Sequence, residues 1–266
     1  MKKRFVRILK VLAVIYLAIV VVLYFFQERL IFFPQKLDRN KAFSFTGPFE
    51  EMSFRTRDAV RLNGILFKAD SSKGLIFYLH GNGGSLEGWG RTAPAYTALH
   101  YDVFMLDYRG YGKSEGHISS EAQLHEDIQQ VYDSLKGLYG ERNIVVLGYS
   151  IGTGLAARLA ADNHPKMLIL QAPYYSLVSM MRTRYPWLPT FILRYRLETN
   201  KYLPGCAAPI VIFHGDCDDV IACENSNRLK ALLKPGDTLI MLKGQGHNSM
   251  SDNQEYLRAI GGVLSK

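Results

Sequence analysis

One hydrophobic stretch of the chain is much longer than the others. Residues 11–26 read V-L-A-V-I-Y-L-A-I-V-V-V-L-Y-F-F, which is sixteen positions without a charge. Counted from Ile8, with the Lys10 amine extended toward the membrane surface, the run has nineteen positions. A helix of nineteen residues is about 28 Å long, close to the hydrocarbon thickness of a bilayer. The pattern therefore predicts a transmembrane helix over residues 8–26.

Two other structures could explain such a run. A cleaved secretory signal needs small residues at its cleavage site, whereas this run ends in Y-F-F-Q-E-R. A buried core helix is disfavoured because the run is apolar on every side and begins at the amino terminus. We therefore expect an uncleaved anchor, with a basic segment at residues 1–10 and a juxtamembrane connector at residues 27–48.

Beyond the connector, β-branched or aromatic runs of strand length alternate with segments of helical period. The predicted strands are 61–67, 74–79, 102–106, 143–147, 167–170, 209–213 and 237–242. The predicted helices are 90–99, 119–139, 152–163, 222–233 and 251–264. Ser120 and Gln123 fit a capping box for the second of these helices. The alternation indicates an α/β fold, with a mainly parallel central sheet, helices on both faces, and chemistry at the carboxyl ends of the strands.

One segment interrupts this alternation. About forty residues separate the strands that end at Leu170 and Phe213, and they include five prolines. We interpret this segment, about residues 174–205, as a small cap insertion over the sheet. No linker composition appears after the connector, so residues 49–266 are expected to form one domain.

Composition and charge exclude several classes of protein. An apolar content of 48% excludes a disordered chain, and three cysteines are too few to hold a fold of 266 residues together. The net charge of +8 would suit a nucleic-acid-binding protein. Five positive charges, however, lie within the first ten residues: Lys2, Lys3, Arg4, Arg7 and Lys10. Stretches 27–41 and 175–205 add +2 and +4, which leaves the rest at −3, so we expect no nucleic-acid partner.

The same charges predict an orientation. Positive residues before a span favour a cytoplasmic amino terminus, so the domain is expected to be extracytoplasmic, and periplasmic in a bacterium. In an oxidising compartment Cys217 and Cys223 could pair and leave Cys206 single. Three unpaired cysteines are an equally suitable interpretation.

The strongest local motif follows the strand 143–147. It reads Gly148-Tyr149-Ser150-Ile151-Gly152 and leads into a helix of small residues. A serine on so sharp a strand-to-helix turn needs glycine on both sides, and its hydroxyl is exposed at a helix amino terminus. G-x-S-x-G is weak as a bare pattern, but between these two elements it predicts a nucleophilic Ser150.

A serine nucleophile requires a histidine base that is oriented by a carboxylate. For this elbow the chain order is serine, acid, histidine. His247 lies in a glycine-containing loop after the last strand, which suits a mobile base, whereas His214 ends a strand and is expected to be held there. The acid candidates after that strand are Asp216, Asp218 and Asp219, and spacing alone does not choose among them.

Five motifs at separate strand ends now indicate a family. They are His80-Gly81-Asn82-Gly83, the run D-Y-R-G-Y-G-K-S from Asp107, the elbow, an H-G-x-x-D-x-x-V-like run from His214, and Gly246-His247-Asn248. From about Phe49 to its end the chain resembles the serine-dependent α/β-hydrolases. It is most similar to their membrane-anchored branch, which includes the ABHD depalmitoylases and single-pass bacterial hydrolases.

The resemblance implies roles for further residues. In the family the acid lies four residues after the H-G histidine, which implies Asp218, although Asp219 remains an alternative because Val220 comes one position early. The backbone N–H of Asn82 is implied as an oxyanion donor beside the N–H of Ile151, the residue after the nucleophile. Asp107 and Arg109 are interpreted as braces of their loop.

These residues predict a serine hydrolase that cleaves carboxylic ester or thioester bonds through an acyl-enzyme, with no cofactor. No Cys and His pair has zinc spacing, so no metal is expected. The apolar insertion and the anchor suggest lipid-like esters or acylated proteins as substrates, and membrane lipids as partners. An acyltransferase with the same triad and a non-catalytic membrane interaction protein are the alternatives.

Overall fold

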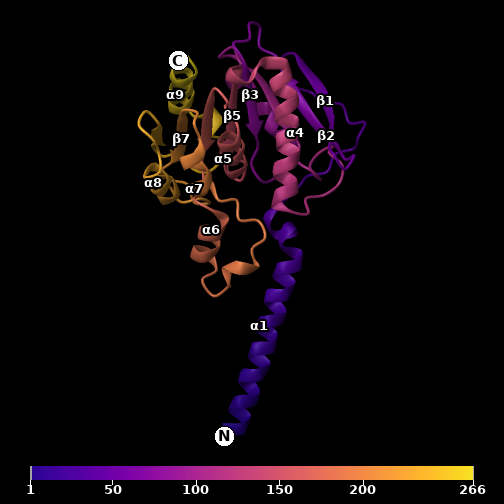
Figure 1. Cartoon of the computed structure of the whole chain (residues 1–266), viewed down its shortest axis with the longest axis vertical. Helices are drawn as coiled ribbons and strands as arrows, with labels where there is room; N and C mark the ends of the chain where they lie inside the picture. Colours follow the sequence, from indigo (N-terminus) through magenta and orange to yellow (C-terminus); the bar gives the residue numbers. More distant parts are fainter. Residues whose placement is uncertain (1, 266) are drawn as a thin grey trace.

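The computed structural model describes residues 2–265, and its centre is an eight-stranded sheet (Figure 1). The strands are β1 Phe49–Arg55, β2 Arg61–Phe67, β3 Leu75–Leu79, β4 Asp102–Leu106, β5 Ile144–Tyr149, β6 Met167–Gln171, β7 Ile210–Gly215 and β8 Thr238–Leu242. They lie in the order β1-β2-β4-β3-β5-β6-β7-β8, and β2 is antiparallel to both of its neighbours while all other pairs are parallel. The mainly parallel sheet expected from the sequence is therefore confirmed.

Helices cover both faces of the sheet. The helices within residues 2–265 are α1 Lys2–Ile31, which does not cover the sheet, and α2 Leu86–Trp89, α3 Pro94–Thr97, α4 Glu121–Tyr139, α5 Gly152–Asp162, α6 Leu177–Arg184, α7 Thr199–Tyr202, α8 Glu224–Lys230 and α9 Gln254–Leu264. Buried side chains of α4 and α5 belong to the core on one face, and those of α3 and α9 to the core on the other. The fold is that of an α/β-hydrolase.

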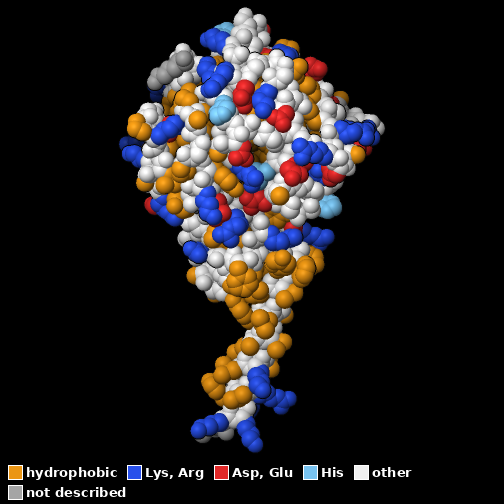
Figure 2. All heavy atoms as spheres, in the orientation of Figure 1, with side chains coloured by type: hydrophobic (Ala, Val, Ile, Leu, Met, Phe, Trp, Pro, Cys, Tyr) orange, Lys and Arg blue, Asp and Glu red, His pale blue; other side chains and the backbone are white. Residues whose placement is uncertain are grey.

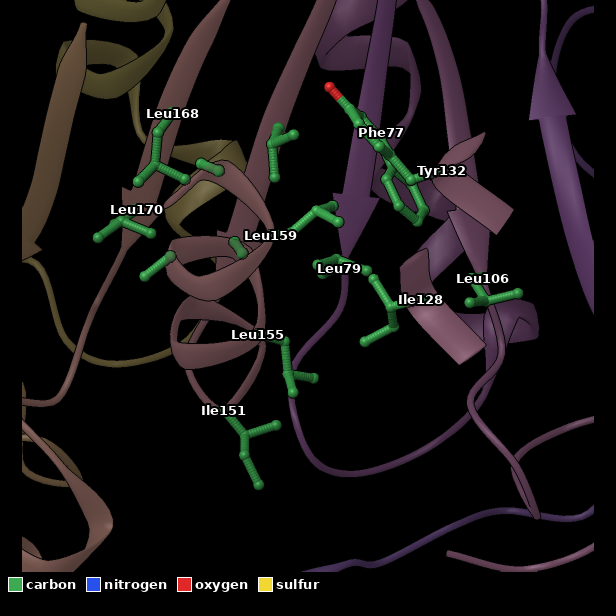
Figure 3. Packing of buried hydrophobic residues seen from close by; sticks show 14 of the residues in the cluster. Phe77, Leu79, Leu106, Ile128, Tyr132, Ile151, Leu155, Leu159, Leu168 and Leu170 are labelled. Atoms are coloured by element: carbon green, nitrogen blue, oxygen red, sulfur yellow. The ribbon is translucent and has the colours of Figure 1, made fainter. Parts of the chain in front are cut away.

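The core under α4 and α5 is built from large aliphatic and aromatic side chains (Figure 3). Ile128 and Tyr132 of α4 and Leu155 of α5 pack over Phe77 and Leu79 of β3. All five residues of β3 are buried, as expected for a parallel strand that is covered on both sides. Since β3 is central, this packing fixes the positions of the loops that follow β3 and β5.

Three elements differ from the sequence expectation. Strand β1 was not predicted, because it is an edge strand in which no residue is fully buried. In place of the helix expected at 90–99 the structure has a 3-10 turn at Gly90–Thr92 and the short helix α3, since Pro94 cannot donate the hydrogen bond of a continuous helix. The helix expected at 222–233 is shortened to α8.

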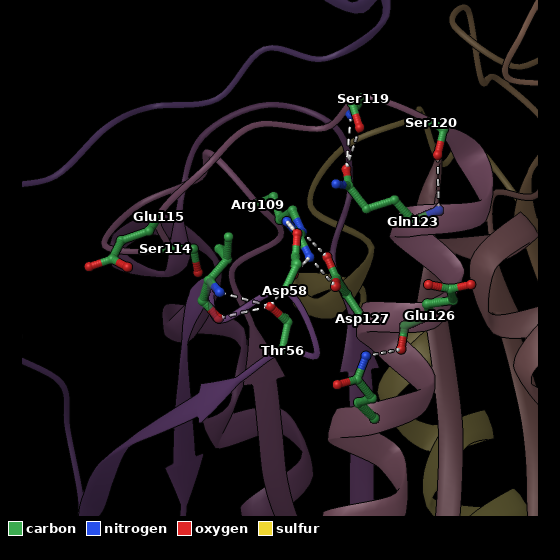
Figure 4. Close-up of polar contacts among 12 residues, drawn as sticks. Thr56, Asp58, Arg109, Ser114, Glu115, Ser119, Ser120, Gln123, Glu126 and Asp127 are labelled. Carbon is green, nitrogen blue, oxygen red and sulfur yellow. Dashed lines mark hydrogen bonds and ion pairs between the residues drawn. The ribbon is translucent and has the colours of Figure 1, made fainter.

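Polar contacts fix the loops at one end of the sheet (Figure 4). The amide of Gln123 donates to Ser120 Oγ at 3.1 Å and caps α4, whereas the Gln123 side chain bonds to Ser119 instead of closing the reciprocal half of the capping box. Arg109 forms ion pairs with both Asp58 and Asp127. Arg109 thus connects the β1–β2 turn to α4, which agrees with a bracing role.

Helix α1 extends away from the domain, with its amino terminus at the far end (Figure 1). It is long and apolar enough to cross a membrane, and none of its most apolar window is buried within the structure. Figure 2 shows hydrophobic side chains along α1 and on the adjoining end of the domain, with Lys and Arg at the tip. A core helix of a soluble domain would instead be buried.

The segment between β6 and β7, which we call the cap, contains α6, a 3-10 turn at Thr190–Ile192 and α7. Part of it lies beside α1. The amide of Arg194 donates to Gln27 Oε1 at 2.8 Å, and Gln27 Nε2 donates to the carbonyl of Ile192 at 3.2 Å. Gln27 is the one buried residue of α1, so its amide joins the helix to the cap.

Candidate active site

The turn between β5 and α5 has the strained geometry that its sequence suggests. Ser150 has a φ of 50°, in the left-handed region that side chains other than glycine rarely adopt. A Cβ at Gly152 would lie 2.1 Å from the carbonyl oxygen of Leu79, and one at Gly148 would lie 2.5 Å from the carbonyl oxygen of Gly152. Only glycine therefore fits on either side of the serine, which is presented at the start of α5.

His247 lies between Ser150 and Asp218. Its Nε2 is 3.0 Å from Ser150 Oγ, and its Nδ1 is 2.7 Å from Asp218 Oδ2. All three residues are buried, with exposed fractions of 9% or less. The three residues come from the loops after β5, β7 and β8, so the parallel sheet brings them to one edge.

Asp218 is held as a carboxylate by several donors. The amides of Val220 and Ile221 donate to its Oδ1 at 2.9 and 2.8 Å. Burial alone would raise the pKa of Asp218, but hydrogen bonds from His214, His247 and the Ile221 amide hold it well below its usual range. A charged Asp218 can orient the His247 ring and stabilise its protonated form.

His214 supports this acid. It is fully buried, and its Nε2 lies 3.3 Å from Asp218 Oδ2 and 2.8 Å from the carbonyl oxygen of Ile221. Its Nδ1 is 2.6 Å from Ser226 Oγ. The sequence placed His214 at a strand end but did not indicate its contact with the acid, since that contact depends on how the loop after β7 folds back.

The other two aspartates lie apart from His247. Asp216 is exposed, and its Oδ1 accepts from the amide of Gly244 at 2.6 Å, which supports the base of the His247 loop. Asp219 is exposed, and only its backbone carbonyl takes part, accepting from Arg184 at 3.4 Å. The geometry thus brings Asp218 alone of the three to the histidine.

Two further residues line the cavity beside Ser150. The residues are Asn82 and Ile151, and neither amide donates to a protein acceptor within residues 2–265. The Asn82 side chain is fully engaged elsewhere: its Nδ2 donates to the carbonyl of Ile31, and its Oδ1 accepts from Phe33 and Tyr111. The sequence did not indicate that this loop is bound to the end of α1.

Tyr149 is a further residue that the sequence did not single out. Its hydroxyl donates to the backbone carbonyl of His247, and its ring packs against the imidazole with centroids 5.9 Å apart. It therefore positions the histidine loop from within the elbow. Tyr149 is part of the G-x-S-x-G motif, because it directly precedes the serine, but only the fold shows that its hydroxyl contacts the His247 loop.

Ser150, His247, Asn82 and Ile151 line a cavity of about 810 Å³, whereas Asp218 lies behind His247 outside the lining. Its other walls come from α1, from the loop after β3 and from the cap. Apart from His247, Arg184 is the only ionisable side chain of basic type in the lining, and no Asp or Glu contributes to it among the described residues. The cavity is therefore apolar with a single cationic group, and suits an acyl chain.

The cysteines carry no disulfide in residues 2–265. Cys206 is buried, Cys217 is exposed and Cys223 is half-buried. Burial raises the pKa of Cys206, and a neighbouring Asp216 raises that of Cys217. A raised pKa leaves a thiol protonated, so neither group has the character of a nucleophile.

Comparison with known proteins identifies the family of the chain. The family model described as serine aminopeptidase, S33, matches residues 70–205. The chain belongs to this family. Protein Rv2307c of Mycobacterium tuberculosis is 30% identical over 90% of this chain and 88% of its own. Members of the S33 family are serine hydrolases, and the present chain is one of them.

Two further proteins are similar to this chain, one in sequence and one in structure. The lysophosphatidylserine lipase ABHD12 of Macaca fascicularis is 26% identical over 70% of this chain, and the match covers 53% of that longer protein. An esterase structure from Pyrococcus furiosus has a TM-score of 0.71 and 18% identity, over 88% of this chain and 97% of the esterase. At that identity the esterase supports the fold alone. The resemblance to the α/β-hydrolases and their ABHD-type branch is thus confirmed.

Proposed function

We propose that the protein is a membrane-anchored serine hydrolase that cleaves carboxylic ester or thioester bonds through an acyl-enzyme. The observation that carries the proposal is the hydrogen-bonded series from Ser150 through His247 to Asp218 at the wall of a large apolar cavity. In this reading Ser150 is the nucleophile, His247 the general base and Asp218 the acid. The backbone N–H groups of Asn82 and Ile151 form the oxyanion hole.

Acylation begins when Ser150 Oγ attacks the carbonyl carbon while His247 Nε2 takes its proton. Negative charge on the former carbonyl oxygen is stabilised by the amides of Asn82 and Ile151, and positive charge on the imidazole by Asp218. As the tetrahedral intermediate collapses, the bond to the leaving oxygen or sulfur breaks, and His247 returns the proton to that leaving group.

Deacylation repeats these steps with water. His247 takes a proton from water as its oxygen attacks the acyl carbon, and the second tetrahedral intermediate expels Ser150 Oγ, which recovers the proton. The product is a carboxylic acid. If an alcohol attacked the acyl-enzyme in place of water, the same residues would catalyse acyl transfer. The identity of the acceptor therefore distinguishes a hydrolase from an acyltransferase.

The lining of the cavity favours an acyl substrate over a peptide amino terminus. An aminopeptidase must accommodate a positively charged amine, which a carboxylate would stabilise. The described cavity lining includes no Asp or Glu, and its one cation, Arg184, would repel an amine. The family description therefore does not by itself extend aminopeptidase activity to this chain.

Location follows from the anchor. Helix α1 would cross the membrane once, with the five basic residues of its first ten positions in the cytoplasm and the domain on the opposite side. The substrates we propose are lipid-like esters, with acylated proteins as a second class, since both carry an acyl chain that suits the cavity. The ABHD12 relative supports the lipid class through its description as a lipase.

Covalent labelling tests the assignment. A fluorophosphonate probe reacts with a serine only when the base and the oxyanion donors activate it. We expect the full chain to be labelled and Ser150→Ala not to be. Ser134→Ala, an exposed serine on α4, serves as the matched control and should label as the unmutated protein does. Absence of labelling in the unmutated protein would favour a non-catalytic membrane interaction protein.

A further inference from the structure

One side of the anchor helix is part of the cavity. Ile19, Leu23, Gln27, Leu30 and Ile31 all line it, and their spacing of three to four residues places them on one face of α1. Ile19 and Ile31 are about 18 Å apart along a helix axis. Ile19 and Leu23 lie in the part of α1 that we expect within the membrane, and Gln27, Leu30 and Ile31 continue the cavity from there toward Ser150.

The cap runs along the same face of α1. At one end Gln27 binds the backbone at Ile192 and Arg194, and at the other the hydroxyl of Tyr16 donates to the carbonyl of Trp187 at 3.0 Å. Tyr16 and Gln27 are about 16 Å apart along the helix. The cap tip, residues 185–193, thus reaches about as deep along α1 as the cavity does.

The cap tip is unusually apolar for an exposed segment. It reads Y-P-W-L-P-T-F-I-L without a charge, and exposed fractions are 53% for Tyr185, 55% for Trp187 and 80% for Phe191. Exposed arginines flank it: Arg182, Arg184, Arg194 and Arg196. Figure 2 shows hydrophobic side chains where the domain joins α1, with Lys and Arg behind them. Aromatic residues at the lipid boundary with basic residues at the headgroups are typical of a membrane-embedded surface.

We propose that α1 and the cap form an acyl channel that opens into the lipid leaflet, through which the acyl chain of a membrane lipid ester enters sideways and lies along α1 with its carbonyl at Ser150. This inference rests on the proposed hydrolase function and names the source of its substrate. The anchor is then a wall of the binding site as well as a tether.

The dimensions support a source in the leaflet. One leaflet is about 15 Å deep, half of a hydrocarbon core of about 30 Å. The cavity follows α1 for about 18 Å, so a chain could pass from the leaflet into the channel while remaining parallel to the helix and surrounded by apolar groups. Entry from water would instead expose the whole chain before it is bound.

The channel can be tested by filling it from α1. Leu23→Trp places a large side chain in the channel, and Val21→Trp places the same side chain on the far side of the helix, because two residues are separated by about 200°. Val21 is 52% exposed and does not line the cavity. Both variants and the unmutated full chain are reconstituted in phosphatidylcholine nanodiscs. The substrates are p-nitrophenyl palmitate within the bilayer and p-nitrophenyl acetate in solution.

We expect Leu23→Trp to lower the palmitate-to-acetate ratio of kcat/KM at least about tenfold, since the long chain needs the filled space and the short one does not. Val21→Trp should keep the ratio of the unmutated protein. Equal ratios in the two variants would overturn the channel. Cleavage of acetate but not of palmitate by the unmutated protein would also overturn it, and would leave the hydrolase function intact.

Two further outcomes separate this inference from its premise. If the unmutated protein hydrolyses neither ester and takes up no fluorophosphonate, the proposed function fails and the inference with it. If an S-palmitoyl peptide in the same nanodiscs is cleaved much faster than lysophosphatidylcholine, an acylated protein is the occupant and the lipid assignment is overturned.

Fluorescence tests the depth of the cap tip independently of activity. The chain has two tryptophans, Trp89 and Trp187, so Trp187→Phe identifies the signal of the cap. In nanodiscs with brominated acyl chains we expect Trp187 to be quenched, and the quenching to be lost in Trp187→Phe. Equal quenching of the two proteins would show that the cap tip stays outside the lipid and would overturn the proposal.

Discussion

At the scale of single residues, the choice of acid is the sharpest distinction in the site. Three aspartates follow β7, but Asp218 alone is buried and bonded to His247. The loop turns Oδ1 of Asp218 toward the amides of Val220 and Ile221, which leaves Oδ2 for the imidazole. Asp219, one residue later, is exposed. It could take the place of Asp218 beside His247 only if this turn refolded.

Substitution of Asp218 and of Asp219 should have different effects on activity. Asp218→Asn removes the charge that fixes the His247 tautomer, and the equivalent change in a serine protease lowers kcat about 10⁴-fold. We expect a loss of similar size in ester hydrolysis here, and a change within about twofold for Asp219→Asn. Steady-state kinetics on p-nitrophenyl acetate measure both. A larger loss in Asp219→Asn would reassign the acid.

His80 and Asp107 form a buried pair near the loop that carries Asn82. The distance between them is that of an ion pair. Asp107 Oδ1 lies 3.9 Å from His80 Nε2 and accepts from the amide of Leu86 at 3.0 Å. Burial raises the pKa of Asp107 to about 7 and lowers the pKa of His80 to about 4. Both groups therefore favour their neutral forms, and the pair braces the loop without a strong charge.

The raised pKa of Asp107 has a consequence for stability. Between about pH 4 and 7 the folded protein holds a proton on Asp107 that the unfolded chain releases, so this residue lowers the free energy of unfolding as pH rises through that window. His80 acts in the opposite direction between about pH 4 and 6.5, because its folded pKa is lowered. The difference in the free energy of unfolding between the unmutated protein and a variant at Asp107 therefore isolates the contribution of Asp107.

We expect Asp107→Asn, which keeps the acceptor for Leu86, to gain stability relative to the unmutated protein as pH rises from about 4 to 7. A gain of roughly 1–4 kcal/mol is expected, since one pKa unit corresponds to about 1.4 kcal/mol. Denaturant unfolding at several pH values measures it. A constant difference across the window would mean that Asp107 is ionised in the folded protein throughout.

At the scale of elements, the elbow depends on the close approach of β5, α5 and β3. Gly152→Ala would bring a Cβ within 2.1 Å of the Leu79 carbonyl in the neighbouring strand, and backbone cannot move aside as a side chain can. We expect strong destabilisation, of about 3 kcal/mol or more, with loss of fluorophosphonate labelling.

A second glycine provides the control. Gly137 lies on the exposed side of α4, and a Cβ there would meet nothing within 4 Å. Gly137→Ala should stabilise the protein by about 0.5–1 kcal/mol through helix propensity. Thermal unfolding of the two variants measures the contrast. Similar midpoints would mean that the elbow relaxes more easily than its geometry indicates.

The elements themselves were predicted to different degrees. Continuous apolar runs identified the central strands, because a strand that is covered on both faces has no polar side. Strand β1 was missed because an edge strand of alternating pattern resembles a loop over seven residues. The hydrogen bonds between Gln27 and the cap could not be predicted from the sequence, because a single glutamine at the end of an apolar run is typical of the membrane boundary.

At the scale of the whole molecule, charge and hydrophobicity are separated along one axis. Basic residues mark the tip of α1, apolar side chains follow it up to the cap, and the domain beyond carries mixed charges (Figure 2). Such a molecule suits a bilayer around α1 with the active-site edge of the sheet toward the lipid. The loop after β3, which is bound to the end of α1 through Asn82, then has a fixed position relative to the membrane.

Orientation across the membrane is a prediction at this scale. Five positive charges before the span favour retention of the amino terminus in the cytoplasm, although Arg29, Lys36 and Lys41 after it oppose this bias. Alkaline phosphatase fused to the carboxyl terminus should be active in a bacterial host, and a cytoplasmic reporter in its place inactive. The reverse pattern would place the domain in the cytoplasm.

The sequence by itself determined the parallel α/β architecture, the long apolar helix and the serine elbow, and it predicted His247 as the base, because each depends on a local pattern of periodicity, glycine or chain order. Tertiary structure alone decided that Asp218 reaches the histidine, that His214 and Tyr149 support it, and that α1 lines the cavity. Those contacts join residues up to about 170 positions apart, and no local pattern encodes where two distant segments meet once the sheet has assembled.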